Sequence, residues 1–242
     1  MATETQRQML KHDQNGSNWG TRVFLQPIAP PSVLGLFGFA AATFIVAAHM
    51  AGWYGNASTP QYLFPFAAFF GGLAQFLAGM WSYRARDVVA TAMHGMWGSF
   101  WMAYGLLFLL FATGQLTEPK GAFPALGIWF FPLGAITAAG AVAALAESLG
   151  LFAVLSSLSA GSWLAWIALT WNFGTLETIA GWVFVFSAGF AFYTATAMML
   201  EGAFGRTVLP LFKYERSANV PGGKPTRPIE LQWAEPGVKQ GQ

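Results

Sequence analysis

Eight polar side chains within long uncharged stretches of this 242-residue chain are the residues whose types could do chemistry there. They are His49, Gln75, His94, Ser99, Ser157, Ser159, Ser162 and Tyr193. Amide, hydroxyl and phenol groups exchange hydrogen bonds with a small solute, and imidazole can also carry a proton near neutral pH. Polar groups isolated in apolar surroundings mark functional positions, so we expect the function of the chain to depend on uncharged donors and acceptors.

The composition of the chain excludes several kinds of chemistry. The chain has no cysteine, which excludes disulfides, thiol redox chemistry and thiolate metal sites. No HExxH or GxSxG string occurs, and no carboxylates are paired within the uncharged stretches. We therefore expect no enzyme activity, no metal and no cofactor. His49 and His94 are candidates for a proton-carrying or polar role, with an ordinary hydrogen-bonded interior histidine as the alternative.

The elements that must position these residues are membrane-spanning helices. Hydrophobic residues make up 55% of the chain and charged residues only 9%, against about 25% charged in a typical soluble domain. Asp, Glu, Lys and Arg are absent from residues 31–83, 88–117, 121–146, 148–176 and 178–200. Each stretch is long enough for a helix of about 20 residues to cross the hydrocarbon core of a bilayer.

Six spans follow from these stretches, because "GNASTPQ" at 55–61 collects helix-breaking residues and divides the first stretch in two. The predicted spans are 33–53, 62–82, 88–112, 123–146, 149–171 and 178–200. Stretches such as "FVFSAGFAFYTATAMML" lack the alternation of a transmembrane strand. The prediction is an all-α polytopic membrane protein: a six-helix bundle at 33–210 between polar tails at 1–32 and 211–242.

The basic residues predict the orientation of the bundle. Of the 12 Lys and Arg residues, Lys120 alone lies on one side of the predicted spans, and the others lie before span one, between spans two and three, or after span six. Positive residues favour the cytoplasmic side, so both termini are predicted to be cytoplasmic. This asymmetry also accounts for the net charge of +2 without a nucleic-acid partner.

Short strings spread along the chain resemble one family. "AFGRTVLP" (203–210) closes the last span, "LGLFGFA" (34–40) lies in the first, "GGLAQFLAGMWSY" (71–83) in the second, "WGSFW" (97–101) in the third, and "AGWVF" (180–184) leads into the sixth. These strings are similar, in the same order, to motifs of the acetate uptake transporter family, the acetate/succinate transporters of bacteria and fungi. The signature residues matched are Gly35, Phe204, Gly205, Arg206, Thr207 and Pro210.

The resemblance implies a plasma-membrane transporter that assembles as a homo-oligomer, a hexamer, with a solute path inside each subunit. It implies a hydrophobic waist formed by Phe39, Trp97 and Leu158, with Gln75 beside the path. Two departures affect the expected chemistry: "APPSVLGL" (29–36) lacks the usual asparagine before the first span, and Trp97 stands where the family usually has tyrosine.

The resemblance also implies passage of acetate or a similar short carboxylate, including succinate, either together with a proton or as in a channel. A carboxylic acid titrates near the pKa of Glu, about 4.3, so near neutral pH it is mostly an anion. The expected donors along the path are Gln75, Trp97, Ser99 and Tyr193. Two alternatives remain: a channel for small neutral solutes such as urea or ammonia, and a structural or signalling membrane subunit without a path.

Overall fold

The uncharged stretches fold into long helices. A computed structural model describes residues 28–214, and no strand occurs among them. The elements are α2 (Pro31–Met50), α3 (Thr59–Phe66), η1 (Ala67–Ala74), α4 (Gln75–Ala85), α5 (Val88–Ala112), α6 (Pro124–Ala144), α7 (Leu149–Trp171) and α8 (Gly174–Phe204). With α3, η1 and α4 continuous, six helices in the described part of the chain are long and apolar enough to cross a membrane. The predicted all-helical, multi-pass membrane fold is confirmed.

The observed boundaries differ from the predicted ones mainly in the second and sixth spans. The second begins at Thr59 rather than 62, because Pro60 occupies the first turn, where a helix needs no N–H from it. The sixth extends over Gly174–Phe204, with Glu177 and Glu201 in its first and last turns. Charged side chains at the ends of a helix can reach water. A prediction that ends each span at the nearest charged residue therefore makes this span too short.

The second span also contains a π-helix, η1, which the sequence pattern did not predict. It follows Pro65, which lies inside α3 and has no N–H for the hydrogen-bond ladder. Wide π-helical turns are uncommon and often lie at functional positions. Gln75 is the first residue after this segment, so the change of helical geometry occurs next to a predicted path residue.

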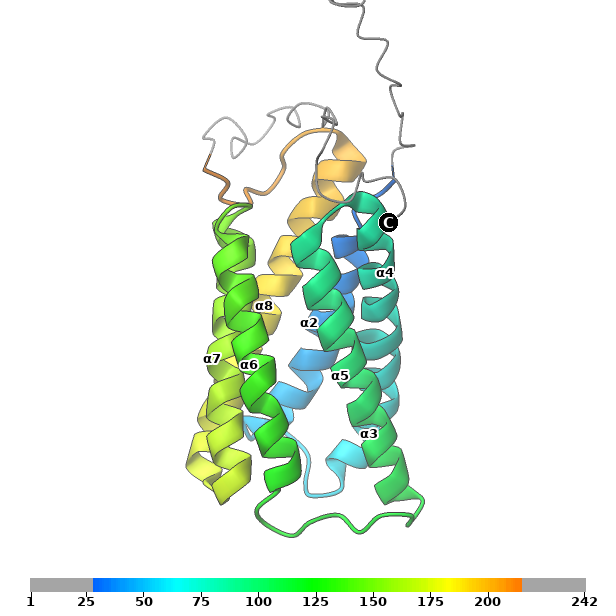
Figure 1. The fold of residues 1–242 in the computed structure, drawn as a ribbon, viewed down its shortest axis with the longest axis vertical. Helices are drawn as coiled ribbons and strands as arrows, with labels where there is room; N and C mark the ends of the chain where they lie inside the picture. Colours follow the sequence, from blue (N-terminus) through cyan, green and yellow to red (C-terminus); the bar gives the residue numbers. More distant parts are fainter. Residues whose placement is uncertain (1–27, 215–242) are drawn as a thin grey trace, which may run out of the picture. The chain divides into compact units, whose positions relative to one another are not determined.

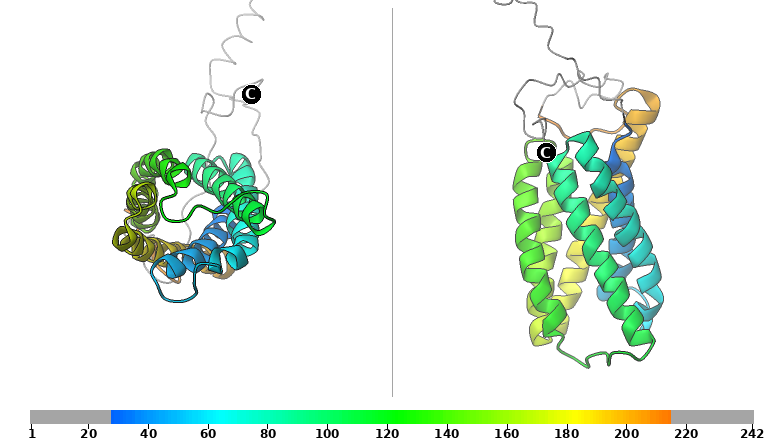
Figure 2. Two further views of the ribbon diagram at one scale, coloured as in Figure 1. Left: turned by 90° about the horizontal axis from the view of Figure 1, so that it is seen from below. Right: turned by 45° about the vertical axis from the view of Figure 1, so that its right-hand side comes forward.

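The six spans pack side by side around a common axis (Figures 1 and 2). In order around this axis, α2 is followed by α4 with η1, then α5, α6, α7 and α8, which contacts α2 again. Glycines allow the closest approaches: the position of a Cβ on Gly38 of α2 is taken by the carbonyl oxygen of Phe70, and a Cβ on Gly98 of α5 would lie 2.6 Å from the backbone nitrogen of Phe76.

One face of α5 carries a buried aromatic stripe into the interior of the bundle. Its rings recur at helical spacing and are Trp97, Phe100, Trp101, Tyr104, Phe108 and Phe111. Successive rings touch, for example Phe100 and Trp101 at 5.3 Å between centroids and Tyr104 and Phe108 at 4.5 Å. Aromatic side chains therefore fill the interior along most of α5, and the open space lies near the start of this helix.

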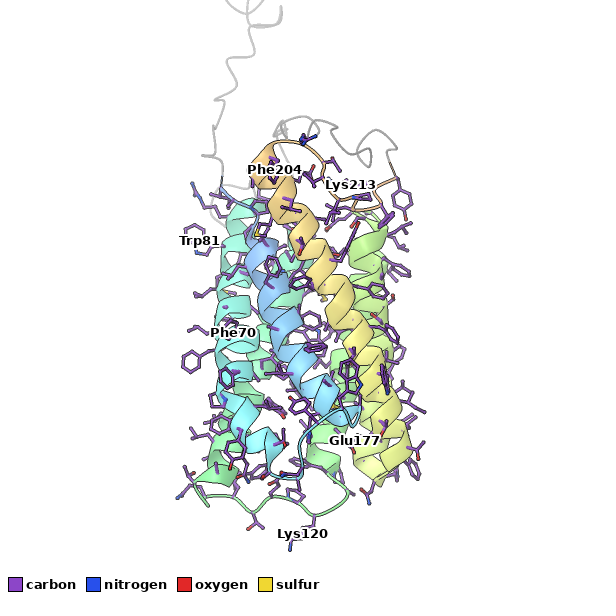
Figure 3. The ribbon with its side chains drawn as sticks, turned by 180° about the vertical axis from the view of Figure 1, so that it is seen from behind. Phe70, Trp81, Lys120, Glu177, Phe204 and Lys213 are labelled. Atoms are coloured by element: carbon purple, nitrogen blue, oxygen red, sulfur yellow. The ribbon has the colours of Figure 1, made fainter. Side chains whose placement is uncertain are left out.

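The outer surface of the bundle is apolar, as a lipid-facing surface must be. Phe70 and Trp81 project outward from the second span (Figure 3), with 55% and 56% of their surface exposed. Lys120 and Lys213 lie at opposite ends of the bundle in the same view. This separation agrees with the topology of six spans, while the orientation in the membrane and the tail boundaries remain predictions.

Candidate solute pocket inside the bundle

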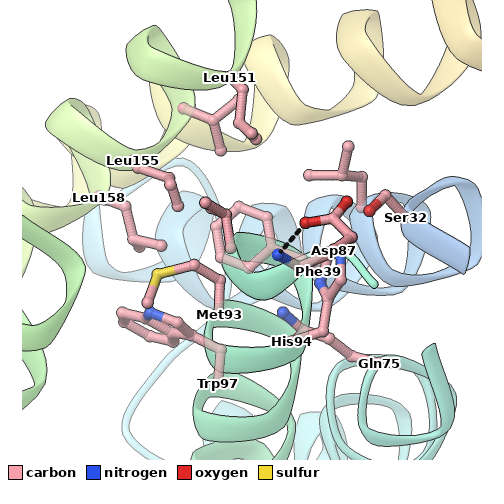
Figure 4. A pocket seen from close by; sticks show the side chains of 14 residues that line it. Ser32, Phe39, Gln75, Asp87, Met93, His94, Trp97, Leu151, Leu155 and Leu158 are labelled. Atoms are coloured by element: carbon pink, nitrogen blue, oxygen red, sulfur yellow. Dashed lines mark hydrogen bonds between the residues drawn. The ribbon is translucent and has the colours of Figure 1, made fainter. Parts of the chain in front are cut away.

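A pocket lies inside the bundle near the N-terminal ends of α2, α5 and α7, which lie at the same end of the bundle (Figure 4). Its lining residues are Ser32, Leu36, Phe39, Gln75, Asp87, Val89, Ala90, Met93, His94, Trp97, Leu151, Val154, Leu155 and Leu158. The cavity volume is about 30 Å³. At roughly 10–15 Å³ for each water, it has room for two or three waters or a solute of a few heavy atoms.

Four predicted path residues meet at this pocket. Phe39, Trp97 and Leu158 are each only 2% exposed, and the rings of Phe39 and Trp97 pack edge to face with centroids 6.1 Å apart. They come from α2, α5 and α7, so three helices supply the apolar surface at the positions where the family resemblance implies a waist. Gln75, also 2% exposed, lines the same pocket.

The indole of Trp97 is oriented differently from our expectation. Its Nε1–H donates a 3.0 Å hydrogen bond to the hydroxyl oxygen of Thr137, a fully buried residue of α6. The Thr137 hydroxyl in turn donates to the carbonyl oxygen of Leu133 at 2.7 Å. Because the indole N–H is engaged within the protein, Trp97 offers its apolar ring to the pocket rather than a hydrogen bond.

Two buried polar atoms on the pocket wall have no hydrogen-bond partner among the described residues. They are Oε1 of Gln75 and Nδ1 of His94. His94 is 4% exposed, so both side chains are more than nine-tenths buried. Leaving such a group unpaired costs about 1–3 kcal/mol. The pocket can therefore be stabilised by a small polar guest that reaches these atoms.

Glycines hold the imidazole in place. A Cβ on Gly35 of α2 would lie 2.5 Å from ring atoms of His94, so only a glycine leaves room for the ring there. A Cβ on Gly79 of α4 would lie 2.7 Å from the backbone nitrogen of Gly95, the residue after His94. The close contacts of α2 and α4 with α5 fix the ring against the pocket, opposite the leucines of α7 (Figure 4).

Acidic groups lie at the end of the pocket nearest the α4–α5 turn. Asp87 is the N-cap of α5, where its Oδ1 accepts a 2.8 Å hydrogen bond from the backbone N–H of Ala90. Glu147, in the α6–α7 turn, is exposed as a whole, but its carboxyl group is partly withdrawn from water. This burial, together with the negative charge of Asp87, raises the pKa of Glu147 to about 7. Asp87 is therefore the carboxylate on the pocket lining, and Glu147 lies close enough to respond to its charge.

The other predicted polar residues lie away from this pocket. Ser99 is exposed and donates to the carbonyl oxygen of Gly95 in its own helix. Tyr193 donates to the carbonyl oxygen of Pro210, and Nδ1 of His49 lies 3.1 Å from the carbonyl oxygen of Tyr54. The hydroxyls of Ser157, Ser159 and Ser162 each donate to a backbone carbonyl oxygen. None of these side chains is among the lining residues.

The signature string at 203–210, together with the two residues after it, has a structural role near the pocket. Gly205 ends α8 with a φ of +63°, and the following segment crosses to the start of α7. The carbonyl oxygens of Leu211 and Phe212 accept hydrogen bonds from the backbone N–H groups of Gly150 and Leu149 at 3.2 and 3.1 Å. The first N–H groups of a helix lack partners within it, so this segment caps α7 just before the pocket residue Leu151.

Sequence reasoning missed Asp87 as a pocket residue, although Asp directly before an apolar run is a recognisable helix N-cap. The cap position can be read from the sequence, but the side of the helix that faces a cavity cannot. It also missed Ser32, Leu36, Met93 and the leucines before Leu158, because these spans are apolar on all sides. Only the packing of neighbouring helices decides which of their residues face inward.

Comparisons with known proteins agree with this fold. The sequence profile of the GPR1/FUN34/yaaH family matches residues 17–213. The succinate-acetate/proton symporter SatP of Escherichia coli strain K12 is 29% identical over 184 residues, covering 76% of this chain and 95% of that protein. The solved structure of the bacterial acetate channel SatP matches with a TM-score of 0.70 and 27% identity, covering 76% and 99%. Ammonia transport outward protein 2 of Saccharomyces cerevisiae is 32% identical over 81 residues, covering 34% and 28%.

Proposed function

Because the chain belongs to the GPR1/FUN34/yaaH family, we propose that it carries acetate or a similar short carboxylate, such as succinate, across the membrane. The similarity extends over nearly the whole length of a succinate-acetate symporter and of an acetate channel. It assigns the chain to membrane transport rather than to enzymes. The observation that carries the substrate assignment is the small pocket in which Gln75 lies beside the apolar surface of Phe39, Trp97 and Leu158.

The pocket suits a solute with one polar and one apolar end. The amide of Gln75 can hydrogen-bond a carboxyl group, while the rings and leucines contact a methyl or methylene group. An anion loses several kcal/mol of hydration on entering an apolar passage, and uncharged donors compensate for only part of this loss. We therefore propose that the waist passes the neutral acid, so that a proton accompanies the solute. Weak binding favours release.

Uptake of labelled acetate into vesicles containing the purified protein tests this proposal. We expect saturable uptake that propionate inhibits and urea does not, and that falls when the pH gradient is removed. Gln75→Ala is expected to reduce uptake, and Ser99→Ala, on the exposed face of α5, serves as its matched control. Acetate uptake no faster than in protein-free vesicles would refute the proposal.

A channel for ammonia is the second candidate, supported by the similarity to ammonia transport outward protein 2. That similarity covers about a third of this chain, against three quarters for the symporter. Stopped-flow measurements of internal pH after addition of ammonium salts would distinguish the two. Faster alkalinisation than in protein-free vesicles, without saturable acetate uptake, favours the ammonia channel.

A further inference from the structure

The two unpartnered atoms in the pocket differ in chemistry. Oε1 of Gln75 is an acceptor, whereas an imidazole nitrogen is either an acceptor or, when protonated, a donor. His94 and Asp87 are the titratable residues among those that line the pocket from α2, α4, α5 and α7. Asp87 already caps α5, and the turn before it carries Arg84 and Arg86. Within the pocket, His94 is thus the group able to exchange a proton with a solute.

We propose that His94 accepts the proton of the carboxylic acid in this pocket, a role that rests on the proposed carboxylate transport. The O–H bond of the neutral acid breaks, and an N–H bond forms at Nδ1 of His94. The solute becomes a carboxylate beside an imidazolium, and the side-chain N–H of Gln75 donates a hydrogen bond to the same carboxylate. The step is reversible, consumes no other reactant, and leaves the summed charge of solute and ring unchanged.

The position of His94 relative to the waist explains why a proton acceptor belongs here. Phe39, Trp97 and Leu158 present apolar surface, with the indole N–H of Trp97 held by Thr137, so an ion crossing between them would lose hydration without compensation. Once the acid has reached the pocket beside the waist, it can give its proton to His94, because an adjacent carboxylate favours the charged form of imidazole. Return of the proton restores the neutral acid for passage in the other direction.

His49 offers a matched control. It lies 14 positions beyond Gly35, the α2 residue that contacts the His94 ring, and at 1.5 Å per residue this separation is about 21 Å along the helix. Its Nδ1 faces the carbonyl oxygen of Tyr54 near the end of α2. His94→Gln therefore removes a titratable ring inside the pocket, and His49→Gln removes one outside it.

The first test follows the protonation of His94 directly. Protein with ¹⁵N-labelled histidine in lipid nanodiscs is titrated with and without acetate, and the His94 signal is assigned by its loss in His94→Gln. We expect acetate, but not urea at equal concentration, to raise the midpoint of the His94 titration and leave that of His49 unchanged. An unchanged His94 midpoint at saturating acetate would overturn the proposal.

The second test measures binding of trifluoroacetate by ¹⁹F NMR at pH values from 3 to 8, with the protein in lipid nanodiscs. Trifluoroacetate stays ionised throughout this range, so its binding reports protonation of the protein alone. For the wild type and His49→Gln, we expect trifluoroacetate to bind about tenfold more weakly at the alkaline end, through loss of a charge-assisted hydrogen bond. His94→Gln and the ring-preserving His94→Phe should lack this dependence.

These outcomes separate the two proposals. Acetate transport by the wild type, together with an unaltered trifluoroacetate profile in both His94 variants, refutes the role of His94 and leaves carboxylate transport intact. Absence of acetate transport in the wild type refutes the proposed function itself. His94→Phe keeps an aromatic ring beside Gly35 while removing the titratable group, so it separates the loss of the imidazole from the loss of a ring.

Discussion

At the scale of single residues, Trp97 sets the size of the waist. Its indole is anchored to Thr137 and packs against Phe39 and Phe100. Trp97→Phe removes ring volume, and Thr137 keeps its own hydrogen bond to Leu133, so no buried hydroxyl is orphaned. We expect Trp97→Phe to raise uptake of butyrate relative to acetate by up to about 15-fold, because each of the two additional methylenes gains about 0.8 kcal/mol when the longer chain fits.

Trp101→Phe is the control for this change. Trp101 lies one turn further along α5, is equally buried, and does not line the pocket. The ratio of butyrate to acetate uptake should stay at the wild-type value in this variant. Equal ratios for Trp97→Phe and the wild type would show that Trp97 does not limit solute size.

Glu147 makes the pocket end of the bundle sensitive to pH. Its pKa is raised from 4.5 to about 7, first by burial and second by Asp87, so the folded protein favours the protonated carboxyl. The stability contributed by this group is fully present below pH 4.5 and is lost as the pH rises through about 7. Asp87→Asn keeps a good N-cap and removes the charge, so it should lower this pKa.

Thermal unfolding in detergent between pH 4.5 and 8 checks this expectation. The fall in melting temperature across this range should shift to lower pH in Asp87→Asn and become smaller in Glu147→Gln. If Glu147→Gln keeps the full pH dependence of the wild type, another group is responsible.

The resemblance identified the interior residues better than chemical type did. Phe39, Trp97 and Leu158, named from family motifs, all line the pocket, whereas Gln75 and His94 are the two pocket residues among the eight named because they are polar. In a membrane a serine on a lipid-facing surface can satisfy its hydroxyl with a carbonyl of its own helix, as Ser99 does. Polarity alone therefore does not tell a path-facing position from a lipid-facing one.

At the scale of elements, two glycines of α5 have different roles although they are the same residue type. A Cβ on Gly98 would lie 2.6 Å from the backbone nitrogen of Phe76, while a Cβ on Gly95 meets nothing within 4 Å. Backbone cannot move aside as a flexible side chain can. Gly98→Ala is thus expected to destabilise the bundle by about 1–3 kcal/mol, and Gly95→Ala to leave it as stable or slightly more so.

Reversible unfolding in mixed detergent micelles measures both variants. Similar stabilities for Gly95→Ala and Gly98→Ala would mean that α5 and α4 do not approach as closely as described. Assembly should be monitored in the same samples, because an association contact at Gly95 would also lower the stability of Gly95→Ala.

The end of α8 gives a second pair of glycines with opposite expected signs. A Cβ added to either Gly202 or Gly205 would meet no atom within 4 Å, so sterics do not distinguish them. Gly205 has a φ of +63°, which costs an alanine about 1–2 kcal/mol, whereas Gly202 is helical, where alanine gains about 0.5–1 kcal/mol. The melting temperature of Gly205→Ala should therefore be lower, and that of Gly202→Ala higher, than that of the wild type. A shift of both melting temperatures in the same direction would refute this account.

The elements themselves were largely predictable. Spans three and five match residues 88–112 and 149–171, because Asp87 and Ser148 cap their starts and charge-free stretches define their lengths. The π-helix was not predictable, since its residues are ordinary helix-forming apolar ones and the wide turn depends on Pro65 and contacts with α2 and α5. The capping of α7 by residues after α8 depends equally on tertiary contact.

At the scale of the whole molecule, the interior is divided between a pocket and packed rings. The pocket reaches Asp87 and Ser32, at the beginnings of α5 and α2, whereas the aromatic stripe fills the interior from Phe100 to Phe111. A solute in the pocket therefore faces aromatic packing on one side and helix ends on the other. Hexameric assembly, implied by the family resemblance, remains a prediction that native mass spectrometry in detergent can test.

The side of the membrane on which the pocket end lies follows from charge, and the absence of cysteine makes it directly measurable. Arg84 and Arg86 in the α4–α5 turn and Lys213 beyond α8 should lie in the cytoplasm, with Lys120 of the α5–α6 connection outside. In intact cells, a membrane-impermeant maleimide should label Lys120→Cys at once and Lys213→Cys only after permeabilisation. Because six spans return the chain to its starting side, the reverse labelling pattern would invert the whole bundle and put the His94 pocket on the outer side of the waist.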